Sequence, residues 1–185
     1  NCLSKTHCKK LLNKYRKKMY HQTETLQYGV SKQNTSHQTK PFKECEETEW
    51  LNYKMSNIAL QDVQNSNVHC DFSTKLTLLR YSKDQYAAKH VDALTEEEME
   101  TLKVDFQFKF TVIAYLNEAI GGELWFPEYQ KVYKPNTGDI FIWRNVVEPL
   151  MKQKNVEFCV PNLDSVHSSL PVSLGAKHAA VKFYF

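Results

Sequence analysis

The last two thirds of this 185-residue chain consist of short apolar segments separated by turns, which strongly restricts its possible folds. From Phe106 to Leu116, hydrophobic side chains occupy every second position, the period of a β-strand with one buried face. Gly121-Gly122 and the pair of Pro135 and Gly138 mark turns. Further strands are predicted at residues 75–81, 123–126, 132–134, 139–143, 169–172 and 179–185. Many short strands joined by turns indicate antiparallel sheets.

The first third has a helical pattern instead. Ser4 is a candidate N-cap, and apolar residues recur at helical spacing from Cys8 to Met19. A second helix is predicted over residues 46–63. The segment between them, residues 21–41, is rich in Gln, Ser, Thr and Asn and predicts a loop that holds at most a short strand.

Two segments between the predicted strands are candidates for covering a binding site. Thr95 and Glu98 form a capping-box pattern, which predicts one or two helical turns within residues 93–105. Residues 145–164 show no regular period and predict a long loop. A loop of this length in a compact domain often has a functional role.

Helices followed by many short strands predict a mainly β protein with flanking α-helices, and specifically a double-stranded β-helix of the jelly-roll kind. The chain length favours a single catalytic domain over residues 1–185. Within it, we expect residues 1–70 to form a helical support region and residues 71–185 to form the double-stranded β-helix core. Hydrophobic residues make up 42% of the chain, which is enough for a substantial core.

Charge and cysteine content exclude few function classes. The net charge of +3 is too mild to indicate a nucleic-acid partner. We find neither a membrane segment nor a signal peptide, but the chain begins with Asn1 and looks truncated or processed. Five cysteines without zinc-site spacing fit a reducing compartment such as the cytoplasm. A secretory-pathway lumen stays open because of the truncated start.

Three side chains form a candidate metal site. His90 and Asp92 are separated by a single residue, so on an extended segment both point to the same face. His167 lies far downstream, just before the predicted strand at residues 169–172, from which it could reach the same place. Two imidazoles and one carboxylate hold Fe(II) on one face and leave the other face open for chemistry.

Two alternatives to an iron site remain open. The same three ligands could hold zinc with water in the fourth position, although the chain has no HExxH helix to supply a hydrolase with its base. The histidines could also be ordinary surface or core residues. No role is assigned to the histidines without matching companions, which are His7, His21, His37, His69 and His178.

Lys177 follows His167 by ten positions, close to the predicted last strand. A lysine buried inside a barrel is costly unless it meets an anion, so Lys177 is a candidate anchor for an acidic co-substrate beside the metal. The alternative is an exposed lysine on the strand surface.

Several motifs over about residues 76–185 together resemble the prolyl 4-hydroxylases in order and spacing. They are Leu79-Arg80-Tyr81, His90-Val91-Asp92, Thr111 to Asn117, Gly121 to Pro127, Val132 to Pro135 with Gly138, and His167 with Pro171 to Lys177. The first helix, with Leu3-Ser4, Cys8 and Leu11-Leu12, also resembles the opening of that family's catalytic domain.

The resemblance implies a double-stranded β-helix that uses Fe(2+), 2-oxoglutarate and dioxygen, with ascorbate as a further cofactor. It implies that the iron ligands are His90, Asp92 and His167. It also implies that Lys177 pairs with the distal carboxylate of 2-oxoglutarate.

Three further residues receive roles from the resemblance. The hydroxyl of Tyr81 is expected to hydrogen-bond the same carboxylate, and Thr111 and Tyr115 are expected to line the pocket. Plain packing in a sheet is the alternative for Tyr81, and for Thr111 and Tyr115 it explains the residues as well as a pocket role does. We expect four other aromatic residues to belong to the core, although Trp143 could line the substrate groove. They are Trp125, Phe126, Trp143 and Phe183.

The implied function is hydroxylation of prolyl residues in a protein or peptide, with release of succinate and carbon dioxide, in the manner of a procollagen-proline 4-dioxygenase. A proline-rich chain could lie in a groove with aromatic walls, covered by residues 93–105 and 145–164. The same chemistry on a lysyl, free amino acid or nucleobase substrate stays open, as does a non-catalytic jelly-roll binding module.

The chain departs from the family pattern in three places. Lys109-Phe110 precedes Thr111 where relatives often have an arginine, and His178 follows the anchor where they often have a tryptophan. An upstream Arg-Thr-Ser element that shapes the peptide groove is echoed only by residues 37–39. The last of these departures concerns the choice of substrate.

Overall fold

The computed structural model contains three α-helices and one 3-10 turn in the part of the chain that it describes. That part comprises residues 2–15, 21–24, 36–41, 45–65, 70, 72–153 and 156–185. The helices are α1 (Lys5–Tyr15), α2 (Glu46–Gln64) and α3 (Glu96–Leu102), and the 3-10 turn is η1 (Leu163–Ser165).

The larger sheet has six antiparallel strands in the order β1-β2-β3-β14-β5-β9. Their bounds are β1 (His21–Glu24), β2 (Ser36–Pro41), β3 (Thr77–Tyr81), β14 (Lys177–Tyr184), β5 (Phe110–Tyr115) and β9 (Ile140–Arg144). The last strand of the chain therefore lies in the middle of this sheet, between β3 and β5.

The smaller sheet has four strands in the order β4-β12-β7-β8. These are β4 (Ala87–His90), β12 (His167–Ser169), β7 (Leu124–Phe126) and β8 (Lys131–Tyr133). Two-stranded pairs complete the set: β6 (Ile120–Gly121) with β13 (Val172–Leu174), and β10 (Val146–Gln153) with β11 (Val156–Pro161). The two main sheets face each other, since Phe126 of β7 contacts Trp143 of β9 at 5.5 Å between ring centroids. This is the predicted double-stranded β-helix.

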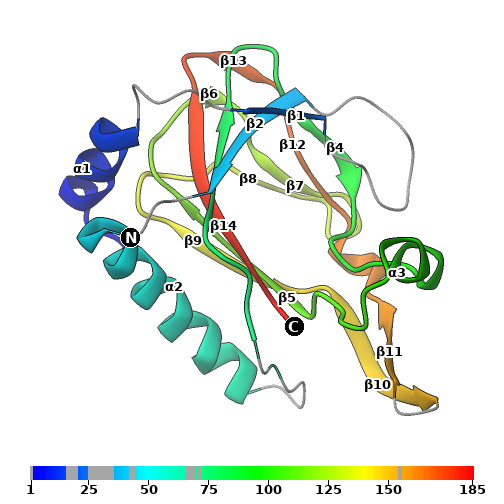
Figure 1. Cartoon of the computed structure of the whole chain (residues 1–185). Helices are drawn as coiled ribbons and strands as arrows, with labels where there is room; N and C mark the ends of the chain where they lie inside the picture. The colour runs from blue at the N-terminus through cyan, green and yellow to red at the C-terminus, as the bar shows by residue number, and fades with distance from the viewer. Residues whose placement is uncertain are drawn as a thin grey trace.

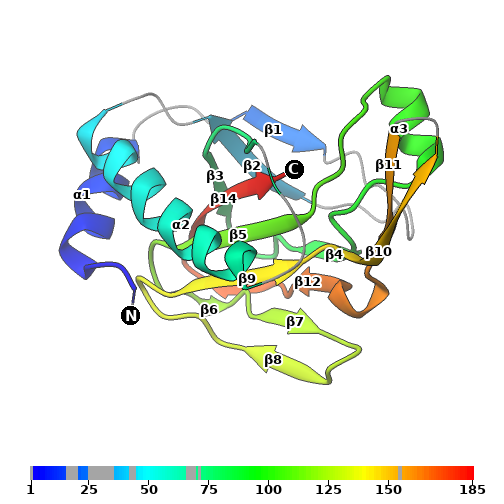
Figure 2. The same cartoon turned by 90° about the horizontal axis from the view of Figure 1, so that it is seen from below.

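Helices α1 and α2 cover the outer face of the larger sheet, as Figures 1 and 2 show. All six residues of β5 are buried as a result, because one face of the strand meets the helices and the other packs in a second apolar cluster with side chains of β3, β14 and β9. The prediction of a half-buried strand over residues 106–116 was wrong in this respect. The strand is shorter, and the helical first third supplies the cover for its second face.

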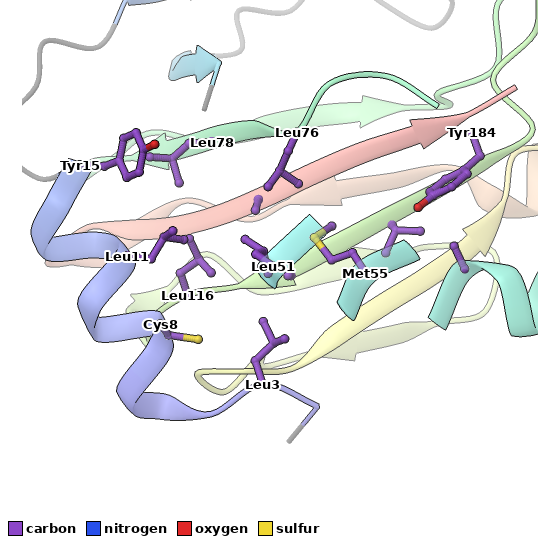
Figure 3. Close-up of a cluster of buried hydrophobic side chains, with 14 of the residues drawn as sticks. Leu3, Cys8, Leu11, Tyr15, Leu51, Met55, Leu76, Leu78, Leu116 and Tyr184 are labelled. Atoms are coloured by element: carbon purple, nitrogen blue, oxygen red, sulfur yellow. The ribbon is translucent and has the colours of Figure 1, made fainter. Parts of the chain in front are cut away.

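The hydrophobic core joins the helices to the sheet. Leu51 and Met55 of α2 are completely buried and pack with Leu11 of α1 against Leu78 and Leu116 (Figure 3). The expected support region and the expected β-helix core thus share one cluster of apolar side chains.

The helix starts agree with the capping signals. In α3, the backbone N–H of Glu98 donates to the Thr95 hydroxyl at 3.3 Å, and the Glu98 carboxylate accepts from the N–H of Thr95 at 2.7 Å. Helix α1 begins directly after Ser4, as predicted, and α2 spans nearly the predicted residues. The predicted extension of the first helix to Met19 lies outside the described residues.

Three segments differ from the prediction. The expected loop at residues 145–164 contains the β10–β11 hairpin and η1. Its strands pair mainly with each other, so they need no apolar period facing a core. The strand predicted at residues 169–172 is instead split between β12 and β13, because Pro171 cannot donate to a strand ladder. The expected loop at residues 21–41 begins and ends with strands β1 and β2.

Among the described helices, none has both the length and the apolar character required to cross a bilayer. Cys2, Cys8, Cys45 and Cys70 do not form disulfide bonds.

Candidate metal and co-substrate site

The three predicted metal ligands meet at one place between the two sheets. His90 ends β4 and faces His167, the first residue of the neighbouring strand β12. Asp92 follows two residues after His90, and its oxygens lie 3.4 Å from Nε2 of His90 and 3.8 Å from Nε2 of His167. One ligand atom from each of the three residues lies within 4.8 Å of the others, so a single metal ion can bind all three.

Backbone carbonyls fix the tautomer of both histidines. Nδ1 of His90 lies 2.7 Å from the carbonyl oxygen of Ala88, and Nδ1 of His167 lies 2.9 Å from that of Ser165. A carbonyl can only accept, so each Nδ1 carries the proton and donates it. The lone pair of each Nε2 is therefore free to coordinate a metal, as in most protein sites with histidine ligands.

The charges of the cluster suit a cation. Burial disfavours the ionised form of Asp92, but its interactions with His167, His90 and Thr111 outweigh burial and lower the pKa of the carboxyl group. Burial, with the neighbouring His90, lowers the pKa of His167 to about 4, so this ligand is neutral at pH 7. Burial disfavours the charged form of His90, but its interactions with Asp92 outweigh burial and raise the pKa of the ring.

Thr111 of β5 holds the carboxylate in place. Its hydroxyl donates to Oδ2 of Asp92 at 2.6 Å and accepts from Nδ2 of the buried Asn145 at 2.8 Å. The pocket-lining role expected for Thr111 stays a prediction, and the hydrogen bond adds a second role, orientation of a metal ligand. Sequence reasoning gave no role to Asn145.

Two aromatic residues pack against His167. The ring centroid of Trp143 lies 4.6 Å from that of His167, and the ring of Phe126 lies 5.7 Å from it. The sequence placed both in the core, which is correct for the buried Phe126, whereas Trp143 is half-buried and packs against a core cluster. The sequence did not reveal that the two rings form the wall behind a metal ligand. Trp125 is half-buried and lies under Nζ of Lys89 at 4.4 Å. Phe183 is half-buried and contacts Phe108 at 4.8 Å between ring centroids.

Lys177 lies in the interior at the first position of β14, with only 3% of its surface exposed. Its Nζ donates to the carbonyl of Gly122 at 2.9 Å and to the hydroxyl of Ser169. The same Nζ lies 4.3 Å from the ring centroid of Tyr81 and 5.7 Å from that of Tyr115. Three predicted co-substrate residues therefore surround one point, beside a small cavity that Tyr115, Gly122 and Lys177 help to line.

The buried ammonium group has no carboxylate within ion-pair distance among the described residues. Burial lowers the pKa of Lys177 to about 7, and the more distant charge of Glu123 opposes this only in part. An ammonium group has three donors, and two protein oxygens use two of them. The site is thus suited to an anionic group that would supply the missing negative charge.

Gly122 makes room for this lysine. The residue has a φ of +74°, and a Cβ there would lie 3.1 Å from Cδ of Lys177 and 3.0 Å from Cγ2 of Val172. A side chain at this position would strain the backbone and push the lysine aside. The glycine pair predicted as a turn therefore also shapes the lysine site.

The family model of the 2OG-Fe(II) oxygenase superfamily matches residues 76–185. A curated relative, a putative prolyl 4-hydroxylase of Acanthamoeba polyphaga mimivirus, is 32% identical over 118 residues, which cover 62% of this chain and 46% of the relative. The chain thus spans about half the length of this relative.

Solved prolyl hydroxylase structures share the fold. The viral collagen prolyl hydroxylase of Paramecium Bursaria Chlorella virus-1, in complex with 2OG, has a TM-score of 0.69 at 20% identity and covers 99% of this chain and 90% of its own. A prolyl-4-hydroxylase of Pseudomonas putida has a TM-score of 0.68 at 14% identity, covering 99% and 88%. A Trichoplax adhaerens prolyl hydroxylase, in complex with a hypoxia inducible factor peptide fragment, has a TM-score of 0.68 at 17% identity. The match covers 100% of this chain and 78% of that chain.

These comparisons confirm the resemblance to prolyl 4-hydroxylases and the double-stranded β-helix. Because the family model spans more than half of the chain and contains all three candidate metal ligands, the chain belongs to the 2OG-Fe(II) oxygenase superfamily.

Proposed function

We propose that this protein hydroxylates prolyl residues in a protein or peptide, using Fe(II), 2-oxoglutarate and dioxygen and releasing succinate and carbon dioxide. The observation that carries the proposal is the pairing of two features in one interior. These are the cluster of His90, Asp92 and His167 and the buried ammonium group of Lys177.

The donor set fits ferrous iron. Two imidazoles and one carboxylate match the facial set of non-haem iron oxygenases and leave coordination positions for a co-substrate and dioxygen. The backbone carbonyls that accept from Nδ1 of His90 and His167 keep both rings in the coordinating orientation.

The co-substrate side fits a dicarboxylate. Lys177 is assigned to the distal carboxylate of 2-oxoglutarate, with Tyr81 and Tyr115 beside it and Thr111 closer to the metal. Burial raises the pKa of both tyrosine hydroxyls, so both remain protonated and can donate hydrogen bonds. Gly122 and Ser169 hold the ammonium group in place before the keto acid arrives.

When bound, the iron and the keto acid together supply the oxidising chemistry that converts a C–H bond into C–OH. The protein's own residues do the rest: three ligands hold the metal, Lys177 and its neighbours orient the co-substrate, and Phe126 and Trp143 keep one side of the site apolar. Such a site excludes water from the reacting atoms.

A row of aromatic rings supports a proline-containing peptide as substrate. Phe183 pairs in register with Thr111, so its ring lies one strand away from the group that holds Asp92. It contacts Phe108 at 4.8 Å, and Phe106 stacks on Phe185 at 4.5 Å between centroids. Rings of this kind bind extended proline-rich chains. The relatives named as prolyl hydroxylases support the same substrate class.

Two neighbouring elements are candidate covers for the substrate. Helix α3 and the β10–β11 hairpin lie side by side on the side of the molecule opposite α1 (Figures 1 and 2). They fall within residues 93–105 and 145–164, where covering segments were expected. Closure of such elements over a bound peptide would sequester the reaction.

The shared hydrophobic cluster supports one catalytic domain over residues 1–185, with residues 1–70 bracing the β-helix core of residues 71–185. Ascorbate belongs to the proposal as the reductant that returns oxidised iron to the ferrous state.

The test is incubation of the protein with Fe(II), ascorbate, 2-oxoglutarate and a panel of proline-rich peptides, followed by intact-mass spectrometry and a succinate assay. We expect one added oxygen atom per modified proline, with succinate in at least an equal amount, and neither product from the Asp92→Ala variant. Oxygen added to lysine, a free amino acid or a nucleobase instead would reassign the substrate. Metal binding without any succinate release would indicate a binding module.

A further inference from the structure

Asn145 lies between β9 and β10 and is completely buried. Its Nδ2 donates to Oγ1 of Thr111 at 2.8 Å, and that hydroxyl donates its single proton to Oδ2 of Asp92 at 2.6 Å. The direction of both bonds is fixed, because the amide nitrogen can only donate and the carboxylate can only accept. We propose that Asn145 is a positioning residue that orients the metal-binding carboxylate through Thr111 and links it to the second histidine ligand.

The link to His167 runs along the backbone. The carbonyl of Asn145 accepts from the N–H of Asn162 at 2.8 Å, and the carbonyl of Asn162 accepts from the N–H and the hydroxyl of Ser165 at 2.9 and 2.6 Å. The carbonyl of Ser165 in turn accepts from Nδ1 of His167 at 2.9 Å. A path of hydrogen bonds thus connects Asp92 to His167. Asn145 lies in the middle of this path, with its side chain on the Asp92 side and its backbone carbonyl on the His167 side.

The same path runs through the root of the β10–β11 hairpin, by which we mean the residues where the hairpin joins the rest of the domain. Asn145 and Asn162 directly flank the hairpin, whose first cross-strand pair is Val146 with Pro161. Val146 is buried against Ala93, the residue next to Asp92. A displacement of these root residues would therefore shift two metal ligands, Asp92 and His167. A bound metal would in turn stabilise the root.

A packing role alone does not explain an asparagine here. Oδ1 of Asn145 is buried without a hydrogen-bond partner among the described residues. Leaving a buried carbonyl unpaired costs free energy, which an apolar side chain of similar size would avoid. The hydrogen bond from Nδ2 to the hydroxyl of Thr111 explains why an amide side chain is present here.

This inference rests on the proposed iron site but not on the proposed substrate, so it is tested by metal binding. Co²⁺ would be titrated into the full chain, with the dissociation constant measured by calorimetry and the ligand geometry by the visible absorption of Co²⁺. We expect Thr111→Val and Asn145→Ala each to weaken Co²⁺ binding about 10-fold or more and to change the spectrum. Thr111→Ser, which keeps the hydroxyl, should have the Co²⁺ affinity and the visible spectrum of the unaltered protein.

The double variant separates positioning from general destabilisation. If Asn145 acts through Thr111, the variant with both substitutions binds Co²⁺ no more weakly than Thr111→Val alone. Independent effects would multiply the two losses and would overturn the relay. Asn136→Ala is the matched control, since Asn136 also donates an amide hydrogen bond but lies in an exposed turn.

Two results distinguish the inference from the proposed function. If the unaltered chain binds no Co²⁺, the proposed iron site fails and this inference with it. If it binds Co²⁺ and a folded Asn145→Ala variant binds it equally well, only the inference fails.

Should Asn145→Ala not fold, the unaltered protein still provides a test. Addition of Zn²⁺ should slow amide hydrogen exchange at Asn162 and Ser165 by about 10-fold or more, because their N–H groups lie on the path between the ligands. Unchanged exchange at both amides would overturn the link to the hairpin root.

Discussion

His90 and His167 face each other directly across the antiparallel pair of β4 and β12, with 4.3 Å between their ring centroids. Neither histidine can reach a shared ion unless these two strands are in register. The metal site is therefore a product of strand pairing in the smaller sheet, while Asp92 joins it from the turn that follows β4.

Replacement of a ligand should remove both metal and activity. We expect His90→Ala and Asp92→Ala each to lower the iron content and the peptide-independent turnover of 2-oxoglutarate by at least about 100-fold, because two ligands do not complete the facial set. Metal analysis and succinate release measure the two effects. His7→Ala is the control, since His7 stacks on Trp50 of α2 and belongs to no candidate site. Wild-type metal content in either ligand variant would refute the assignment.

The two buried lysines of β14 should behave differently. Lys177 faces the interior, whereas Lys182 faces α2 and donates to Asn52 and Ser56. Lys177→Met should raise the KM for 2-oxoglutarate about 10- to 100-fold, because hydrogen bonds to a charged group contribute about 1.5–3 kcal/mol. Lys182→Met should leave this KM within about two-fold. Equal effects of the two substitutions on KM would show that Lys177 has no special contact with the co-substrate.

Binding of 2-oxoglutarate should take up a proton at pH 8. Burial lowers the pKa of Lys177 to about 7 in the folded protein, so this lysine is largely neutral at pH 8 until an anion favours its charged form. Calorimetry in two buffers of different ionisation enthalpy should detect uptake at pH 8 and little at pH 6. Affinity should accordingly fall as the pH rises above 7. Lys177→Arg, which stays charged, should show no such difference between the two pH values.

Lys177 should also make the free energy of unfolding depend on pH, with the opposite sign to its effect on the affinity for 2-oxoglutarate. Between pH 7 and 10.5 the unfolded chain holds a proton on Lys177 that the folded chain lacks. The free energy of unfolding without co-substrate should therefore rise with pH across this window through this residue. Urea denaturation at pH 7 and pH 9 would detect the change, which should be absent in Lys177→Met.

The helical layer should prove essential for stability. Met55 is completely buried between α2 and the larger sheet, so Met55→Ala should lower the free energy of unfolding by about 2–5 kcal/mol. Lys54→Ala, on the exposed side of the same helix, should change it by no more than about 0.5 kcal/mol. Urea denaturation of the two variants tests whether residues 1–70 brace the sheet as proposed.

The sequence was informative where function depends on spacing along the chain. Asp92 follows His90 by two positions, and Lys177 follows His167 by ten. Because strands have a regular repeat, such spacings predict which side chains point into the same interior. The pocket roles of Tyr81 and Tyr115 came from the family resemblance instead, because the alternation from Phe106 to Leu116 places Tyr115 on the face opposite the predicted buried one.

The rest depends on tertiary contacts that have no local signal. Asn145 looks like any polar residue after a strand, and only the fold brings it to Thr111. The β10–β11 hairpin lacks an apolar period because its strands pair mainly with each other. The full burial of β5 was missed because the sequence of one strand does not reveal that helices from the first third of the chain cover it.

The strand register of His90 with His167 has a consequence for thermal stability. A metal ion bound there would act as a removable cross-link between parts of the chain that are distant in sequence and would bind only the folded state. At a free metal concentration 100 times the dissociation constant, it would add about 2.7 kcal/mol to the free energy of unfolding. The melting temperature would then report how much of the protein is loaded, and a chelator would lower it.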